Sequence, residues 1–231
     1  MDAGILAILA SAVVFGLYKG FLVSALNFAG YWIAYLFASL FYGNLATTLS
    51  RNSDVVSLIG QYTQGSTPIA SHVELNATSV YAIADEAAPG LLAELGLTPP
   101  FDSLIARNVV EKAFEAEGAT TLGEYADMTV AGVATDVLCF LLILVAAYVM
   151  TVTLINALNA AMKFPVLAAL DSPLGGAVGF LRGAFICAAA FSALPVVLTI
   201  LDVSMIRDIV YESAYASWFY PDNFVLKMLI N

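Results

Sequence analysis

The chain has 231 residues, of which 61% are hydrophobic and only 11% are charged, and its formal net charge at pH 7 is −10. Soluble globular domains are about 25% charged and about 45–50% apolar, so a water-soluble fold of this length could not cover so much apolar surface. The composition predicts an integral membrane protein, and the acidic balance argues against a nucleic-acid partner.

Four uncharged stretches are apolar enough to form membrane-spanning helices, which need roughly 20 residues to cross a hydrocarbon core. They lie at residues 3–18, 21–42, 137–158 and 184–201. The first is short, and the fourth follows an apolar, glycine-rich lead-in from Leu174. We therefore predict four spans.

The first stretch has one feature of a cleaved signal peptide, because Ala10-Ser11-Ala12 resembles a cleavage site. A signal peptide carries positive charge before its apolar core. Here no positive residue precedes the stretch, and Lys19 follows it. We interpret residues 3–18 as a membrane span that is not removed.

A glycine-flanked cation occurs twice at a constant offset, in "FGLYKGF" at residues 15–21 and in "VGFLRGA" at 178–184. The candidate functional or helix-packing residues of these motifs are Gly16, Lys19, Gly20, Gly175, Gly179, Arg182 and Gly183. Small residues at four-residue spacing let helix backbones approach closely in membranes. We predict that the second and fourth helices pack together near their cytoplasmic ends, and that the repeat marks a duplicated hairpin.

The two cations of these motifs are expected where an outward-running helix leaves the cytoplasmic face. At that depth Lys19 and Arg182 can extend into the lipid headgroups. The simplest interpretation is that each charge anchors the topology. A functional role, such as binding a lipid phosphate or an anionic solute, stays open at this point.

Residues 43–130 hold eleven acidic residues against three basic ones. Their apolar residues follow helical spacing in two runs, which are Val73, Ala77, Val80, Ala84 and Leu91, and then Ile105, Val109 and Ala113. We predict an acidic external insertion built of helices rather than a disordered linker. Its charge could attract a basic partner or metal cations, and a solvated surface explains it equally well.

Capping residues mark two further helix starts. Thr121 and Glu124 have the spacing of a capping box, and the helical pattern continues to Phe164, before Pro165. At 1.5 Å per residue this helix would be about 60 Å long, so we expect it to extend beyond the membrane. Asp171-Ser172-Pro173 predicts the next start, with an oxygen-bearing cap before the proline.

The cations near span ends set the predicted orientation, because Lys and Arg concentrate on the cytoplasmic side. Lys19, Lys163 and Arg182 lie in the two short connections, whereas Arg51 is the one cation of the long segment that lies close to a span. We place these three cations inside, and both termini and residues 43–130 outside.

Five aromatic residues crowd the segment after the fourth span, namely Tyr211, Tyr215, Trp218, Phe219 and Tyr220. Tyr and Trp favour the membrane interface, so residues 203–220 are expected to lie along the outer surface.

The predicted fold class is an all-α integral membrane protein with four transmembrane helices arranged as two parallel-related hairpins. Its parts are a first transmembrane hairpin (1–42), an acidic extracytoplasmic helical insertion (43–130), a second transmembrane hairpin (131–201) and an interfacial C-terminal segment (202–231).

The sequence offers no group of residues for catalysis, a cofactor or a metal. Nucleophilic catalysis usually needs a base within reach of the nucleophile, and the one histidine, His72, lies in the acidic insertion. Cys139 and Cys187 fall inside spans, and no disulfide or metal-ligand spacing is present. We predict that the protein is not an enzyme.

Lys19-Gly20-Phe21 follows the first span, "FPVLAALDSPLGGAVGFLRGAF" lies at residues 164–185, and "ESAYASWFYPDNF" lies at 212–224. These stretches resemble the CvpA family, the colicin V production proteins of bacterial inner membranes, and the last is similar to the tail of clostridial-type members. The resemblance covers roughly residues 1–42 and 125–222, and 43–124 carries no recognised motif. It implies four spans with both ends outside the bacterial cytoplasmic (inner) membrane, and a role in toxin production or export or in envelope homeostasis.

Two functions are compatible with these features. One is a membrane scaffold or accessory factor, which contacts the lipid bilayer and assembles with itself or with other envelope or export proteins. Under this hypothesis, Gly179→Leu and Gly183→Leu are expected to break assembly.

The other is an oligomeric small-solute or ion transporter or channel, in which Lys19 and Arg182 form a cationic cytoplasmic mouth. Ser24 and Asn27, one helical turn apart, could line such a path, or could form hydrogen bonds between helices.

Overall fold

The computed structural model describes residues 1–64, 69, 72–83, 97–162, 171–201, 204–220 and 223–230. Within these residues, four helical segments are long and apolar enough to cross a membrane. They are α1 (Asp2–Lys19), α2 (Phe21–Ser50), α9 (Leu122–Met162), and α10 (Asp171–Phe191) with α11 (Leu194–Leu201). The predicted all-α membrane fold is confirmed.

The chain forms two compact units. Unit 1 comprises residues 1–45, 138–192 and 209–228, and unit 2 comprises residues 46–137, 193–208 and 229–231. Most of the predicted acidic insertion belongs to unit 2, and both α2 and α9 contribute residues to each unit.

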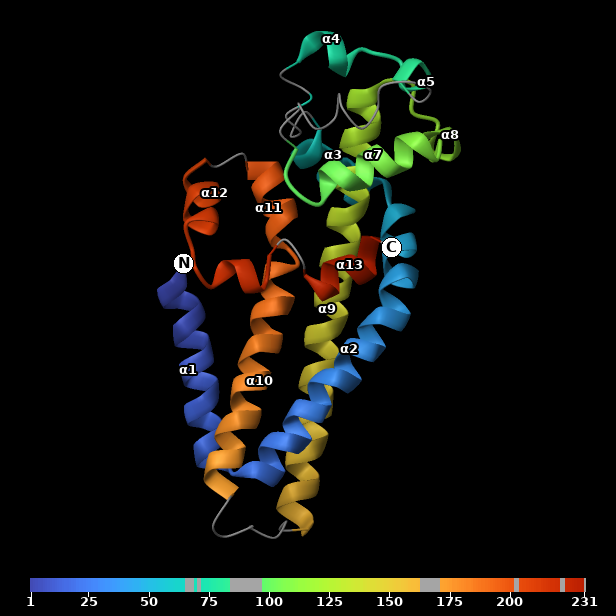
Figure 1. Cartoon of the computed structure of the whole chain (residues 1–231). Coiled ribbons are helices and arrows are strands. Elements are labelled where there is room, and N and C mark those ends of the chain that lie inside the picture. The colour runs from blue at the N-terminus through green and yellow to red at the C-terminus, as the bar shows by residue number, and fades with distance from the viewer. Residues whose placement is uncertain are drawn as a thin grey trace. The chain divides into compact units, whose positions relative to one another are not determined.

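Unit 1 is a helical bundle in which α1 and α10 lie side by side and run in opposite directions (Figure 1). In the same view, α1 passes into α2 at the end of the bundle where α9 ends and α10 begins. The hairpins α1–α2 and α9–α10 therefore point the same way, as predicted. Lys163, Phe164 and Pro165 lie outside the described residues.

The outer surface of unit 1 is strongly apolar. Ile33, Leu36 and Leu40 of α2 are exposed, and so are Leu142 and Met150 of α9. A soluble monomer rarely exposes apolar side chains in such numbers. This surface is therefore the one that faces lipid.

The fourth membrane helix starts at Asp171, as the capping residues predicted, so the glycine-rich lead-in forms its first half. Its end differs from the predicted span, because a turn at residues 192–193 separates α10 from α11. Pro195 explains the break, because proline lacks the backbone N–H that would continue the helix and its ring crowds the carbonyl four residues earlier. The predicted span at 184–201 therefore crosses a helix end.

The long helix α9 begins where the capping residues predicted. The Thr121 hydroxyl accepts a hydrogen bond from the Glu124 backbone N–H at 3.3 Å. The Glu124 carboxylate accepts from the backbone N–H and the hydroxyl of Thr120, at 2.9 and 3.0 Å. The carboxylate thus returns to the residue before the cap, and not to the cap itself as in the standard box.

Unit 2 contains short helices packed around its own apolar core. They are α3 (Ser53–Thr63), α4 (Val73–Asn76), α5 (Val80–Ile83), α7 (Phe101–Val110) and α8 (Phe114–Glu117). Phe101, Phe114, Leu122 and Tyr125 are almost completely buried there. The acidic insertion is therefore a folded helical unit, in agreement with the prediction.

Of the two apolar runs predicted to be helical in the insertion, one forms a helix and the other does not form a single helix. Ile105 and Val109 are buried in α7, and Ala113 follows the end of that helix. The other run is not one helix, because a turn separates α4 from α5 and the Leu122 N–H donates to the Thr78 carbonyl there at 3.0 Å. The Thr78 carbonyl is thus bonded to residue 122 and not within a continuous helix, although the apolar spacing favoured one. Ala84 and Leu91 lie outside the described residues.

The C-terminal segment forms α12 (Ser204–Tyr211), a 3₁₀ turn (Ala216–Trp218) and α13 (Phe224–Ile230). Tyr211 and Trp218 are exposed, as an interfacial position requires, whereas Phe219 and Tyr220 are buried. The Asp2 carboxylate accepts hydrogen bonds from the Ser213 hydroxyl and from two backbone N–H groups after it. The segment is therefore tied to the start of α1.

Asn223 joins α13 to the bundle. Its side-chain oxygen accepts from the N–H groups of Val225 and Leu226, at 2.9 and 3.2 Å, which is N-cap geometry. Its amide donates to the carbonyls of Ala188 on α10 and of Phe219, at 2.7 and 3.1 Å. With the Asn223 side chain only 2% exposed, every hydrogen bond that it makes is inside the protein.

We expect Asn223→Ala to release α13. The change removes the cap and leaves two buried N–H groups without their acceptor, at a cost of about 1–2 kcal/mol. Trypsin should then cut after the exposed Lys227 faster in detergent. Ser217→Ala is the matched control, because among the described residues the Ser217 hydroxyl bonds only to the Ala214 carbonyl in its own turn. Equal cleavage rates in the two variants would contradict this role.

Candidate functional site

The predicted glycines lie where α1 meets α10, and we call Gly16, Gly175, Gly179 and Gly183 the glycine seam. A Cβ at Gly16 would overlap the Gly175 carbonyl oxygen and lie 3.1 Å from the Gly179 Cα. A Cβ at Gly179 would overlap the carbonyl of Ala12 in α1. The two backbones therefore touch, and no larger residue fits between them without displacing one helix.

The seam corrects the predicted helix pairing. It joins the first and fourth membrane helices, and not the second and fourth, because Gly16 lies within α1, one turn before that helix ends at Lys19. These glycines pack against a helix of the same chain. We therefore expect leucine at Gly179 or Gly183 to disrupt the fold of a single chain, and not only its assembly with other chains.

The two copies of the motif also occupy different settings. Lys19 is the last residue of α1, whereas Arg182 lies inside α10, about three turns after Asp171. The expectation that both cations lie at helix ends is therefore wrong for Arg182. Sequence spacing alone does not indicate that the first helix breaks at Gly20 and that its counterpart continues through Gly183.

Two side chains at the start of α10 form hydrogen bonds with the turn between α1 and α2. Gly20 in that turn has φ 79°, a left-handed conformation that favours glycine, and a Cβ there would overlap the Asp171 carboxylate. Asp171 Oδ1 accepts from the Phe21 N–H at 2.9 Å, and the Ser172 hydroxyl donates to the Leu17 carbonyl at 3.0 Å.

These bonds satisfy a free N–H at the start of α2 and a free carbonyl at the end of α1. The sequence predicted the two polar residues as a cap for their own helix. Instead, their side chains serve the ends of two other helices, which a local capping pattern cannot reveal.

Both candidate cations lie against one aromatic ring. Lys19 Nζ is 5.6 Å and Arg182 Cζ is 4.9 Å from the centroid of Phe15. Arg182 Cζ also lies 5.5 Å from the centroid of Tyr31, and its Nε–H donates to the Tyr31 hydroxyl at 3.1 Å. We call Phe15, Lys19, Tyr31 and Arg182 the cation cluster. Neither ring was predicted as part of the site, although the four-residue spacing of Phe15 and Lys19 places them on one face of a helix.

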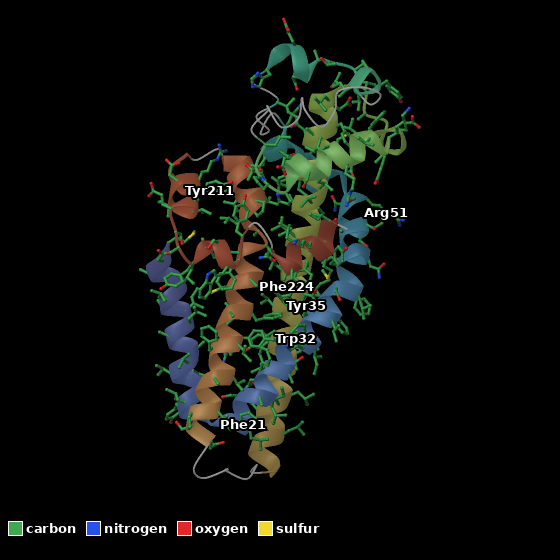
Figure 2. The ribbon with its side chains drawn as sticks, viewed as in Figure 1. Phe21, Trp32, Tyr35, Arg51, Tyr211 and Phe224 are labelled. Carbon is green, nitrogen blue, oxygen red and sulfur yellow. The ribbon has the colours of Figure 1, made fainter. Side chains whose placement is uncertain are left out.

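Aromatic rings fill the space between α2, α9, α10 and α13 in unit 1. Tyr31 stacks on Tyr148 with ring centroids 4.0 Å apart, and Tyr35 lies 5.8 Å from Phe140 and 5.8 Å from Phe224. Figure 2 shows Trp32, Tyr35 and Phe224 gathered in this region. We call Tyr31, Tyr35, Phe140, Tyr148, Phe185 and Phe224 the ring cluster.

Ser24 and Asn27 are both buried on α2. The Ser24 hydroxyl donates to the Gly16 carbonyl at 3.4 Å, which is a bond between helices, and the Asn27 amide donates to the Val23 carbonyl at 2.9 Å. Among the described residues, the Asn27 side-chain oxygen accepts no hydrogen bond. A donor from a water molecule or a ligand would satisfy it.

Each unit also contains a cavity. The one in unit 2 measures about 850 Å³, with Asn76, Glu124, Asp127 and Thr135 among its polar lining residues. The one in unit 1 measures about 330 Å³ and is lined mainly by aromatic residues, with Asn223 at its wall.

Within the described ranges, no cluster of three His, Cys, Asp or Glu side chains could hold a metal ion. Cys139 and Cys187 are buried in membrane helices, and His72 is exposed.

The family model "Colicin V production protein" matches residues 1–83 and 105–219 of the chain. No curated protein and no solved structure matches. The matched ranges contain all seven predicted site residues, and they extend into the insertion, where we had recognised no motif. The predicted resemblance is therefore confirmed over more of the chain than expected.

We expect Gly179→Ala to destabilise the bundle, because the added methyl meets the Ala12 backbone, which cannot rotate away. Overpacking of this kind costs about 1–3 kcal/mol. Gly4→Ala is the control, since a Cβ there meets nothing within 4 Å. Thermal unfolding in detergent, followed by tryptophan fluorescence, should give a lower Tm for Gly179→Ala alone. Identical melting of the two variants would exclude a tight seam.

A second prediction concerns Asp171. Asp171→Ala leaves the Phe21 N–H without its acceptor and should lower the free energy of unfolding by about 1–2 kcal/mol. Asp171→Asn keeps an acceptor oxygen and should retain most of the stability. The exposed Asp208 supplies a control, Asp208→Ala. If Asp171→Asn and Asp171→Ala unfolded alike, the hydrogen bond would not be the stabilising feature.

Proposed function

The chain belongs to the colicin V production protein family, and we propose that it acts as a membrane scaffold or accessory factor in toxin production or export or in envelope homeostasis. In this role the membrane helices anchor the protein, and the folded acidic unit binds a partner. The family match supports a membrane protein of the colicin V production type, and the finer role rests on the features below.

The observation that carries the proposal is the folded state of unit 2. Its core residues are almost fully buried, while Glu74, Glu111 and Glu115 are exposed on its surface. Residues 43–130 together hold eleven acidic residues and three basic ones. A folded surface with a net negative charge attracts partners of the opposite sign and speeds their association. The partner we expect is therefore a protein with a basic surface.

The interior of unit 1 supports an anchoring role. The ring cluster packs rings from four helices between the membrane segments, and Tyr35 also bonds the Met228 sulfur at 3.3 Å. A solute path needs polar groups that replace the hydration shell of the solute. Ser24 and Asn27, the polar residues considered for such a path, instead donate to backbone carbonyls.

For localisation, we propose the bacterial inner membrane, with both termini and the acidic insertion outside. Lys19 is the last residue of α1, at the end of the bundle where α1 turns into α2. The Arg182 guanidinium contacts the same ring, Phe15, as Lys19. The described cations of unit 1's membrane helices thus gather toward the same end, and cations favour the cytoplasmic side.

The transporter hypothesis has one supporting observation, the cation cluster. Because the ring cluster occupies the interior of a single bundle, a path for an anion would have to form between copies of the chain. Transport is therefore the second proposal, and it requires an oligomer.

The test is affinity purification from native membranes in mild detergent, followed by mass spectrometry. We expect a stoichiometric partner with a basic surface, and recovery should fall about tenfold in the Glu74→Gln, Glu111→Gln, Glu115→Gln triple variant, as loss of about 1.4 kcal/mol implies. Glu212→Gln, an exposed carboxylate of unit 1, serves as the control.

A homo-oligomer without a partner would contradict the scaffold proposal. If, in addition, proteoliposomes of that oligomer conducted an anion and Lys19→Gln with Arg182→Gln abolished the flux, the transporter proposal would replace it.

A further inference from the structure

The cation cluster has an excess of positive charge that the described protein does not neutralise. Lys19 Nζ lies 5.6 Å and Arg182 Cζ 4.9 Å from the same ring centroid, so the two charged groups are at most about 10.5 Å apart. Among the described residues, neither cation forms an ion pair, and Asp171 at the start of α10 is bonded to the Phe21 N–H instead. Like charges in a poorly polar environment repel, and a bound anion would remove that cost.

The guanidinium of Arg182 also has donors to spare. It carries five N–H groups, and within the described part of the chain only Nε–H has an acceptor, the Tyr31 hydroxyl. The rings of Phe15 and Tyr31 hold the group by cation–π contacts without using its N–H donors. Four N–H groups of the planar fork are left, and phosphate oxygens bind such a fork in bidentate geometry.

The surroundings of the cluster are those of a lipid-facing surface. Phe15 is 43% exposed and Tyr18 is 85% exposed, and Leu17 and Leu181 beside the two cations are also exposed. Lys19 is the last residue of α1, and cations at such helix ends reach the headgroup region. An anion at this place is therefore within reach of the phosphate layer of the bilayer.

From these observations, we propose that the cation cluster binds a phosphate group, and that the phosphate belongs to the headgroup of an anionic phospholipid. Arg182 receives two phosphate oxygens in its fork, and Lys19 contributes the second charge. Phe15 contacts both cations, and Tyr31 holds Arg182. This site is independent of the scaffold proposal, because it requires no protein partner.

The choice of probe follows from the charge of the cluster. A headgroup whose phosphate carries the only charge offers an anion that no cation of the same lipid neutralises. Phosphatidylglycerol has this chemistry, whereas phosphatidylcholine pairs its phosphate with a quaternary ammonium, so phosphatidylglycerol is the probe of choice.

The experiment compares dioleoyl phosphatidylglycerol with dioleoyl phosphatidylcholine on the full chain in detergent, with bound lipid counted by native mass spectrometry. We expect the wild type to prefer phosphatidylglycerol by about tenfold. Lys19→Gln with Arg182→Gln should reduce that preference to none. Arg51→Gln, at an exposed arginine outside the cluster, should keep it.

A second arm separates lipid phosphate from free phosphate. Inorganic phosphate at 10 mM should not displace the lipid. This concentration is well above the Kd of about 1 mM that a weak phosphate site would have. Displacement, together with thermal stabilisation of the lipid-free protein, would overturn the lipid as the source and leave a site for soluble phosphate.

The fold of each variant is checked by thermal unfolding in phosphatidylcholine. Should the double variant fail to fold, Lys19→Gln alone decides, because Lys19 is exposed and its loss does not disturb the core. In that variant we expect the preference for phosphatidylglycerol to fall about threefold. On a free-energy scale this is roughly half of the tenfold preference of the wild type. Equal binding of the two lipids by the wild type, or an unchanged preference in the folded variants, overturns the proposal.

Discussion

In the glycine seam, the backbones of α1 and α10 touch with no side chain between them, and the positions of several other groups depend on this contact. It brings the start of α10 against the turn after α1, so that Asp171 reaches the first N–H of α2 and Ser172 reaches a last carbonyl of α1. It also sets Arg182 beside Phe15. In a bilayer no hydrophobic effect drives helices together, so close contact between backbones is a main source of association. A larger residue in the seam would displace the capping and the cation cluster at once.

Several polar side chains of unit 1 bond at helix ends. Asp171 and Ser172 act at the turn between α1 and α2, Asp2 acts at the segment after α12, and Asn223 acts at the start of α13. The ends of a helix leave N–H and carbonyl groups without partners, and within lipid no water is present to satisfy them. A chain with so few polar residues can therefore keep its turns inside an apolar environment only if those residues reach across to other helices.

The interior and the edge of unit 1 have different chemistry. Rings pack the interior, where Tyr31 meets Tyr148, and the same Tyr31 presents its hydroxyl to Arg182 at the edge of the cluster. The interior of this bundle is thus aromatic, and two of its cations, Lys19 and Arg182, gather at one ring. In the proposed scaffold role, such a membrane unit holds a fixed position among lipids, while the acidic unit 2 offers its carboxylates to a partner. The combination fits an anchored scaffold better than a channel formed by a single chain.

The amino-acid sequence by itself determined the membrane class, the number of spans, the acidic helical insertion, the start of α9 and the family. These features depend on composition, on local periodicity or on short motifs, which act over one or a few helical turns. It also identified the glycines and cations as a group, because their spacing is local. Only the tertiary structure decided that the seam faces α1, that a turn at residues 192–193 ends α10, and that Arg182 lies inside a helix against Phe15. The physical reason is that a small-residue face permits close packing without specifying the partner, and a capping residue cannot indicate that it serves the end of another helix.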